Sequence, residues 1–222
     1  MDIYEKSLNI LKKIIQNQKK LNIKIILIGG WAVYAYNPYL KSKDIDLLIE
    51  KKNFWRLKDF LEKIGFRQTA SIPLDKKGFA MLFGEDKIEI DVYDEKIVKY
   101  NVKDIFGKNR FESKKIEGRD VLIADRNLLL ALKILAAKDR LGTAKGIKDY
   151  SDILALFDRF YPKLDLDYIK SQIKERELNK VFQLVFADYK KIKDIYPMSF
   201  LRYQKIKNGI FKKFILNKKK IL

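Results

Sequence analysis

Residues 27–50 read LIGGWAVYAYNPYLKSKDIDLLIE, and this stretch decides the predicted fold. The apolar, largely β-branched run IKIILI ends at Gly29 and Gly30, which is typical of a buried strand that enters a tight turn. WAVYAY predicts a helix that ends before Pro38, because the residue preceding a proline disfavours helical backbone. DIDLLIE, residues 44–50, predicts a second strand. Strand, glycine turn, helix and acidic strand therefore follow one another closely.

The acidic strand raises a question of charge. Side chains two residues apart on a strand point the same way, so Asp44 and Asp46 share one face while apolar neighbours pack on the other. Two close carboxylates destabilise each other unless a cation lies between them or one is protonated. In KIEIDVY, Asp91 lies on a strand with the same alternation. If the two strands are neighbours, the three acids converge and suit two metal ions roughly 4 Å apart. The alternative for each acid alone is a solvated strand-edge charge.

The glycine pair fits a phosphate site. Gly29 and Gly30 lie between a strand and a helix N-terminus, where backbone N–H groups can bind phosphate oxygens. Lacking side chains, they let a triphosphate approach the backbone closely. The alternative is an ordinary turn. Trp31 and Tyr34 follow, and one of them could stack on a base, although core packing is the favoured interpretation.

Two residue types are missing from the 222-residue chain. It has no histidine and no cysteine, which excludes Ser-His-Asp triads, cysteine nucleophiles, disulfides and imidazole or thiolate metal sites. Catalysis must then use carboxylates, Lys, Arg, Tyr, Ser or Thr. If a metal is involved, this chemistry favours the hard cations Mg²⁺ or Mn²⁺.

The charge balance indicates the kind of partner. The chain carries 48 Lys and Arg against 29 Asp and Glu, a net charge of +19. Such an excess favours a polyanion such as RNA, because Lys and Arg displace counterions from phosphates. The alternative is the lysine-rich surface of a heat-adapted protein. No apolar run approaches the roughly 18 residues of a membrane span, and the amphipathic start lacks a signal-peptide core, so we expect a cytoplasmic protein without a membrane partner.

The pattern changes along the chain. Before residue 124 it predicts helices near 2–20 and 53–66, and hairpins over 79–93 and 110–125 that turn near Gly84 and Gly118. Beyond it, helical periodicity covers residues 126–140, 148–160, 166–178, 179–192 and 197–216, with GTAKG (142–146) as an internal loop. We predict an α+β fold: a mixed-sheet domain flanked by helices over residues 1–124, then a helical domain over residues 125–222.

These motifs resemble a known superfamily. A glycine pair, a short helix, Asp-x-Asp and a later strand Asp resemble the core of the DNA polymerase β-like nucleotidyltransferases. More narrowly, IGGWAVYAY and SKDIDLLI are similar to the AbiEii-type and minimal nucleotidyltransferases, which include toxins of toxin–antitoxin pairs and antibiotic nucleotidyltransferases. The resemblance implies that Gly29 and Gly30 bind phosphate. It also implies that Asp44, Asp46 and Asp91 are catalytic metal ligands, with Asp91 helping to activate the acceptor hydroxyl.

The chain also departs from that pattern. Relatives often have Ser after the first glycine and Arg-x-Thr-x before the first Asp, where this chain has Gly30 and Leu40. Ser42 could replace the threonine as a nucleotide-binding residue. Lys41 or Lys43 could supply the missing positive charge.

In the helical half, LKILAAKDR and KDYSDILAL are similar to the group's Lys, Arg and Lys-Asp-x-x-Asp pattern. On that resemblance, Lys133 and Lys148 bind nucleotide phosphates; the alternative is a pair of solvent-facing lysines. Asp149 and Asp152 lie three residues apart on one helix face, and we expect them to hold Lys or Arg side chains in place. Arg140 is carried over with them.

Two functions remain open. The first is a Mg²⁺- or Mn²⁺-dependent nucleotidyltransferase that moves a nucleoside monophosphate from an NTP to a hydroxyl, with RNA such as tRNA as the favoured acceptor and an antitoxin protein as a possible partner. The second is a non-catalytic module on the same fold that binds nucleic acid or protein. A phosphodiesterase or nuclease is weaker, because such sites usually also recruit histidine.

Overall fold

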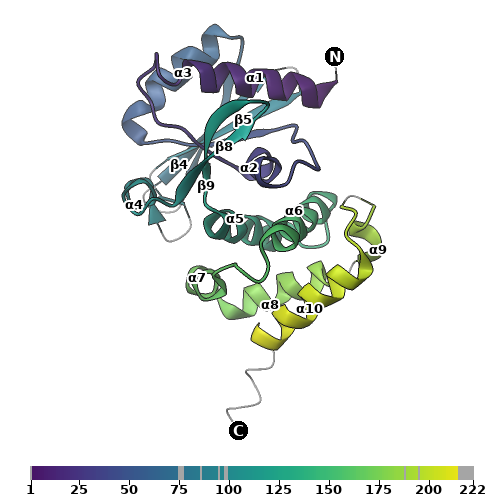
Figure 1. Cartoon of the computed structure of the whole chain (residues 1–222). Coiled ribbons are helices and arrows are strands. Elements are labelled where there is room, and N and C mark those ends of the chain that lie inside the picture. The colour runs from purple at the N-terminus through teal and green to yellow at the C-terminus, as the bar shows by residue number, and fades with distance from the viewer. Residues whose placement is uncertain are drawn as a thin grey trace. The chain divides into compact units, whose positions relative to one another are not determined.

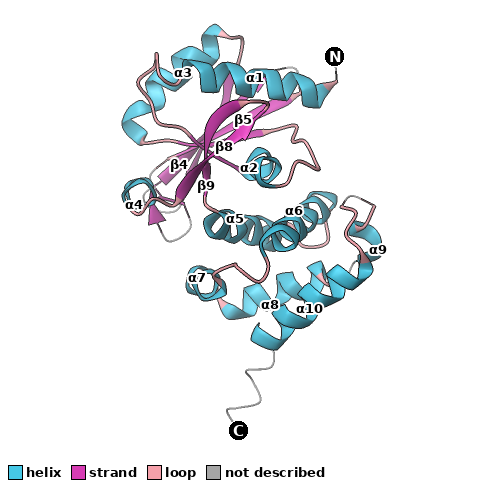
Figure 2. Cartoon of the chain, viewed as in Figure 1, coloured by secondary structure: helices cyan, strands magenta, loops and turns pink. Residues whose placement is uncertain are grey.

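The structure, a computed structural model, describes residues 2–74, 78–85, 87–94, 96–97, 100–187, 189–194 and 196–214. It divides into two compact units, Met1–Asp125 and Arg126–Leu222. Within the described residues, the strands belong to the first unit and the second unit is helical (Figure 2). This confirms the predicted fold class, a mixed sheet with flanking helices followed by a helical region.

A seven-stranded mixed sheet organises the first unit, in the order β3-β4-β5-β2-β1-β9-β8. Its strands are β1 (Ile26–Ile28), β2 (Ile45–Leu48), β3 (Arg67–Leu74), β4 (Gly78–Glu85), β5 (Ile88–Tyr93), β8 (Phe111–Ile116) and β9 (Arg119–Ala124). The unit also contains the pair β6 (Lys96–Ile97) and β7 (Tyr100–Asn101), helices α1 (Ile3–Asn17), α2 (Gly29–Tyr36), α3 (Phe54–Lys63) and α4 (Val102–Gly107), and a 3₁₀ turn at Lys51–Asn53.

Both predicted hairpins form. β4 pairs antiparallel with β5, and β8 pairs antiparallel with β9. In the second hairpin, Glu117 and Gly118 have φ of 48° and 77°, the left-handed backbone that a tight two-residue turn needs. β3 has no counterpart among the predicted elements. It lies at the edge of the sheet, the position in which a strand tolerates a proline such as Pro73.

Apolar burial on both faces holds the central strands. All three residues of β1 are buried, and Ile45, Leu47 and Leu48 of β2 are fully buried. In the view of Figure 1, α1 and α3 lie above the sheet. Trp31 at the start of α2 is fully buried, and its indole N–H donates to Ser7 Oγ of α1 at 3.0 Å, so Trp31 is a core residue.

The second unit contains α5 (Arg126–Asp139), α6 (Ala144–Phe160), α7 (Leu166–Gln172), α8 (Glu175–Val185), α9 (Tyr189–Ile192) and α10 (Phe200–Phe214). An aromatic cluster joins three of these helices. Phe182 of α8 contacts Phe157 of α6 and Phe214 of α10, with ring centroids 5.8 and 5.1 Å apart. The unit therefore has an apolar core of its own.

Four predicted boundaries in this unit are wrong. GTAKG is not wholly a loop, because Thr143 caps α6 by accepting from the Gly146 N–H, so the helix starts at Ala144. The helix predicted over 166–178 breaks at Ile173, whose backbone is extended and whose side chain is buried. α8 then runs across the predicted junction at 178/179. The final helix begins at Phe200, not at Pro197; residues 215 and 216 lie outside the described residues.

Charge is shared unevenly between the units. Lys and Arg exceed Asp and Glu by 23 to 10 over residues 126–222 but by only 25 to 19 over residues 1–125. The helical unit thus carries +13 of the net +19. None of the described helices combines the length and apolar character that crossing a membrane requires.

Candidate active site

The first component of the site is the junction of β1 and α2. Gly29 has φ of +67°, a backbone conformation that other residues adopt at a cost. A Cβ built on Gly29 would lie 1.8 Å from Asp46 Oδ2. A side chain at position 29 is therefore excluded by both the backbone and the neighbouring carboxylate. α2 starts at Gly29 directly after Ile28, and no side chain caps its first turn.

The second component is the acidic pair. β2 and β5 are parallel neighbours, and their register places Asp46 directly beside Asp91. Ile28 of β1 lies beside Asp46 on its other side. Asp44 immediately precedes β2. The condition set by the sequence, that the two acidic strands be neighbours, is met.

The acids repel each other. The pKa of Asp91 is raised to about 7, first by burial and then by the negative charges of Asp46, Glu89 and Asp44. A long hydrogen bond from the Tyr93 hydroxyl to Asp91 Oδ2, 3.4 Å, opposes the shift only weakly. Near neutral pH, Asp91 is therefore divided between its protonated and ionised forms.

One buried oxygen suggests what could relieve this repulsion. Asp44 Oδ1 is buried and has no hydrogen-bond partner, and Lys43 Nζ lies 4.0 Å from it. Burying such an oxygen unsatisfied is costly. Carboxylate oxygens are the donors that Mg²⁺ and Mn²⁺ prefer, so the donor set fits these ions. Nevertheless, no three acidic side chains of the described residues are grouped as a ready-made metal site.

The loop before β2 contains the departures from the family pattern. Ser42, the predicted nucleotide-binding hydroxyl, is buried. Lys41 is paired with Glu5 of α1, which raises the pKa of Lys41 and lowers that of Glu5 through their hydrogen bond. Of the two lysines that could replace the missing arginine, Lys43 is thus the one beside an acid of the site.

In the helical unit, Lys133 of α5 is buried between two acids of α6. Its Nζ lies 3.6 Å from Asp149 Oδ1 and contacts Asp152 Oδ2 at 2.5 Å. Arg140 also reaches Asp149, with 3.2 Å between Nη1 and Oδ2. This confirms the prediction that the two acids hold basic side chains in place. Burial raises the pKa of Asp149 even though Lys133 and Arg140 both lower it.

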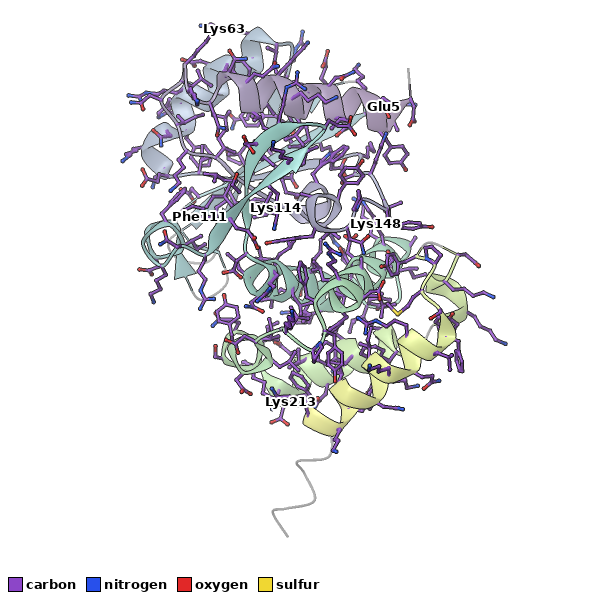
Figure 3. All side chains as sticks on the ribbon, in the orientation of Figure 1. Glu5, Lys63, Phe111, Lys114, Lys148 and Lys213 are labelled. Atoms are coloured by element: carbon purple, nitrogen blue, oxygen red, sulfur yellow. The ribbon has the colours of Figure 1, made fainter. Side chains whose placement is uncertain are left out.

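This network bears on the predicted nucleotide-binding lysines. The ammonium of Lys133 is already engaged by two carboxylates, so a phosphate would compete with them. Lys148, labelled in Figure 3, lies on the same helix as the two acids and is half-buried. Nucleotide binding by either lysine stays a prediction.

Sequence patterns missed one acid near the site. Asp94 follows β5 directly and is fully buried, yet nothing in the sequence distinguishes it from the other acids of this stretch. A surface pocket lies elsewhere, between α3 and the edge strand β3, and its lining includes Lys58, Glu62 and Arg67. It contains none of the predicted site residues.

Comparison with known proteins identifies a family to which the chain is similar. Residues 5–191 match a family described as uncharacterised nucleotidyltransferases. The chain belongs to this nucleotidyltransferase family. The glycine and aspartate motifs predicted a nucleotidyltransferase, and the family match confirms this prediction at the level of the superfamily. Membership of the AbiEii-type subgroup stays a prediction. No curated protein matches the sequence.

Solved structures support the fold of this nucleotidyltransferase. The antibiotic-resistance factor ANT(2'')-Ia in solution is 15% identical, with a TM-score of 0.53 over 87% of this chain and 98% of that one. Its crystal structure with adenylyl-2''-tobramycin is 16% identical, with a TM-score of 0.53 over 83% and 99%. An antigenic nucleotidyltransferase-like protein from Paracoccidioides brasiliensis is 17% identical, with a TM-score of 0.51 over 88% and 91%.

Proposed function

We propose that this protein transfers a nucleoside monophosphate from an NTP to a hydroxyl group and releases pyrophosphate. The observation that carries the proposal is the register of Asp46 beside Asp91, next to the glycine start of α2. Membership of the nucleotidyltransferase family supports the reaction class. The crystal structure of ANT(2'')-Ia with an adenylylated antibiotic supports it by analogy.

Each residue has a role in this proposal. The uncapped first turn of α2, at Gly29 and Gly30, binds the triphosphate through backbone N–H groups. Asp44, Asp46 and Asp91 hold Mg²⁺ or Mn²⁺, which when bound offsets the negative charge of the triphosphate. Asp91, which lies beside Asp46 on the neighbouring strand, accepts the proton of the attacking hydroxyl.

RNA is the acceptor class that we favour. The net charge of +19 supports a polyanionic acceptor over a small molecule or a protein hydroxyl. A role as a toxin, and with it an antitoxin partner, remains a prediction from the sequence resemblance. Cytoplasmic localisation likewise stays a prediction.

The test is a labelling screen. The protein is incubated with Mg²⁺, total cellular RNA or lysate, and each α-labelled NTP in turn, and we expect label to enter an RNA fraction. The matched control is Asp44→Asn with Asp46→Asn, which keeps the side-chain shape while removing both charges. Label that persists in the folded double variant would show that the proposed site is wrong.

A second function is favoured by two positions. Gly30 and Leu40 stand where relatives often have polar groups, as a non-catalytic binding module would allow. Thermal unfolding with millimolar Mg²⁺ or Mn²⁺, with and without NTP, separates the two functions. A ligand that binds only the folded state raises its stability by about 2.7 kcal/mol at 100 times its Kd. Absence of any shift would favour the binding module.

A further inference from the structure

The last described helix, α10, contains no acidic residue. Between Phe200 and Phe214 it carries five basic residues: Arg202, Lys205, Lys207, Lys212 and Lys213. The sequence has no Asp or Glu after Asp194, and three further lysines lie beyond the described residues. Basic residues near the C-terminus of a helix interact favourably with its dipole. Arg202 and Lys205, however, lie in the first half of α10, so the dipole does not explain why all its charged residues are basic.

Internal ion pairs account for only part of this charge. Arg202 donates from Nε to Asp158 Oδ1 at 2.9 Å, and Lys213 Nζ lies 3.9 Å from Asp167. Lys205 and Lys212, in contrast, are exposed and have no acidic partner among the described residues. These two lysines are seven positions apart in the sequence, so they stand about 10 Å apart along one side of the helix.

The side of α10 that faces away from Lys205 and Lys212 packs into the core of the helical unit. Tyr203, Ile206, Ile210 and Phe214 are all buried, at helical spacing. The outward stripe therefore consists of Leu201, Lys205, Asn208 and Lys212, and it lies on the outer side of α10 in the helical unit. Leu201 at the head of this stripe is 83% exposed, and the adjacent Phe200 is 56% exposed.

We propose that the outward stripe of α10 is the surface that binds the backbone of single-stranded RNA, with Lys205 and Lys212 contacting phosphates and Phe200 offering a face on which a base can stack. The choice of RNA rests on the proposed function, in which a polynucleotide hydroxyl accepts the nucleotide. The concentration of charge in the helical unit, +13 of +19, supports the location.

A membrane surface is the competing partner, and the packing argues against it. A helix that lies on a membrane inserts an apolar face between lipids. In α10 that face is already covered by the aromatic core, through contacts such as Phe182 with Phe214 (α8 and α10 in Figure 1). Beyond Leu201, the outward stripe continues with Lys205, Asn208 and Lys212, and these polar side chains suit phosphates along a flexible strand.

The test is binding of a fluorescent mixed-sequence 20-nucleotide RNA to the full chain, without NTP, from 50 to 300 mM KCl. For Lys205→Ala with Lys212→Ala, we expect affinity about tenfold weaker at 0.1 M salt and a salt slope shallower by about 1.4, since each lost phosphate contact on a single strand removes about 0.7. Alanine is favourable at exposed helical positions, so the variant should fold.

The matched control is Lys19→Ala with Lys20→Ala, two exposed lysines in the turn after α1 that give the same change in net charge. Equal losses in the two variants would overturn the proposal, because net charge alone would then explain binding. Tighter binding of the matching DNA strand, or binding to anionic vesicles that depends on Lys205 and Lys212, would also overturn it.

The test of RNA binding by α10 can be distinguished from the test of the proposed nucleotide transfer. Asp44→Asn with Asp46→Asn should bind RNA like the parent protein while transferring no nucleotide. In a transfer assay, Lys205→Ala with Lys212→Ala should raise KM for RNA and leave kcat unchanged. An RNA-binding defect without any transfer activity in the parent protein would refute the proposed function and leave the binding surface standing.

Discussion

At the scale of single residues, Gly29 does more than allow a phosphate to approach. Its left-handed backbone and its contact with Asp46 both exclude a side chain, so the carboxylate sits where a Cβ would otherwise be. The β1–α2 junction and the acidic strand are therefore fitted to each other before any nucleotide binds.

We predict that Gly29→Ala lowers the free energy of unfolding by about 3 kcal/mol, from left-handed strain plus the clash with Asp46. Gly118→Ala is the matched control, because Gly118 has φ of +77° but a Cβ there would meet nothing within 4 Å. Gly118→Ala should therefore lower the free energy of unfolding by only about 1 kcal/mol, from the backbone strain alone. Urea unfolding measures both, and equal costs would refute the clash.

The raised pKa of Asp91 predicts a pH-dependent stability in metal-free buffer. Its pKa is about 7 in the folded state and near 3.8 when unfolded, so between these values the folded state binds more protons. Stability from this group is thus full below pH 3.8 and is lost as pH rises through 7. Asp91→Asn should therefore gain on the order of 2 kcal/mol over the parent protein between pH 4 and 8.

Chemical unfolding in EDTA at several pH values measures this gain. Asp59→Asn, which removes an exposed acid of α3, controls for the change in net charge. A gain for Asp91→Asn that does not grow with pH would contradict the origin assigned to it.

The acids show what can be predicted at this scale. Alternation within DIDLLIE and KIEIDVY places each acid on a strand face, because the period of a strand is local. The alignment of Asp46 with Asp91, in contrast, depends on β2 pairing with β5 across a long connection, which no local pattern specifies. Asp94 was missed for the same reason: its burial comes from tertiary packing.

At the scale of elements, the α5–α6 pair is joined by a buried charge network. Lys133 of α5 lies between Asp149 and Asp152 of α6. Such a network is expensive to leave incomplete, because the remaining charges stay buried.

We predict that Lys133→Met lowers the free energy of unfolding by about 3 kcal/mol, since buried Asp152 loses its cation and buried Asp149 keeps only Arg140. Lys148→Met on α6 should cost under 1 kcal/mol, because Lys148 is half-buried and has no ion pair with the described acids. Thermal and urea unfolding measure both. If Lys133→Met is instead stable but raises KM for NTP, the lysine serves the nucleotide rather than the network.

Helix boundaries are where prediction from the sequence fails at this scale. Helical periodicity predicts one helix over residues 166–178 and another over 179–192, yet the chain turns at Ile173 and again after Val185. Both turns let successive short helices bury their own apolar sides, and this tertiary preference overrides local helix propensity. The hairpin at Glu117 and Gly118 was predictable because its turn chemistry is local.

At the scale of the whole molecule, the predicted boundary at 124/125 implies two domains. Each compact unit has its own apolar core, around the sheet in one and around Phe182 in the other. We expect residues 1–125 and 126–222, expressed separately, each to unfold cooperatively with the circular dichroism of their own secondary structure. A matched cut after Phe160, inside the helical unit, should leave residues 161–222 without such a transition. Unfolded fragments from the first cut would contradict the boundary.

The register of β2 and β5 also has a consequence for the growing chain. Asp44 and Asp46 leave the ribosome well before Asp91, and β2 can pair with β1 before β5 exists. Until β5 is in place, no carboxylate from a neighbouring strand repels these two acids. The electrostatic cost of the site is therefore incurred late in synthesis, when β5 is inserted beside β2. A proton or a cation captured at that moment would aid closure of the sheet, so assembly of the central strands and acquisition of the first ligand can be a single event.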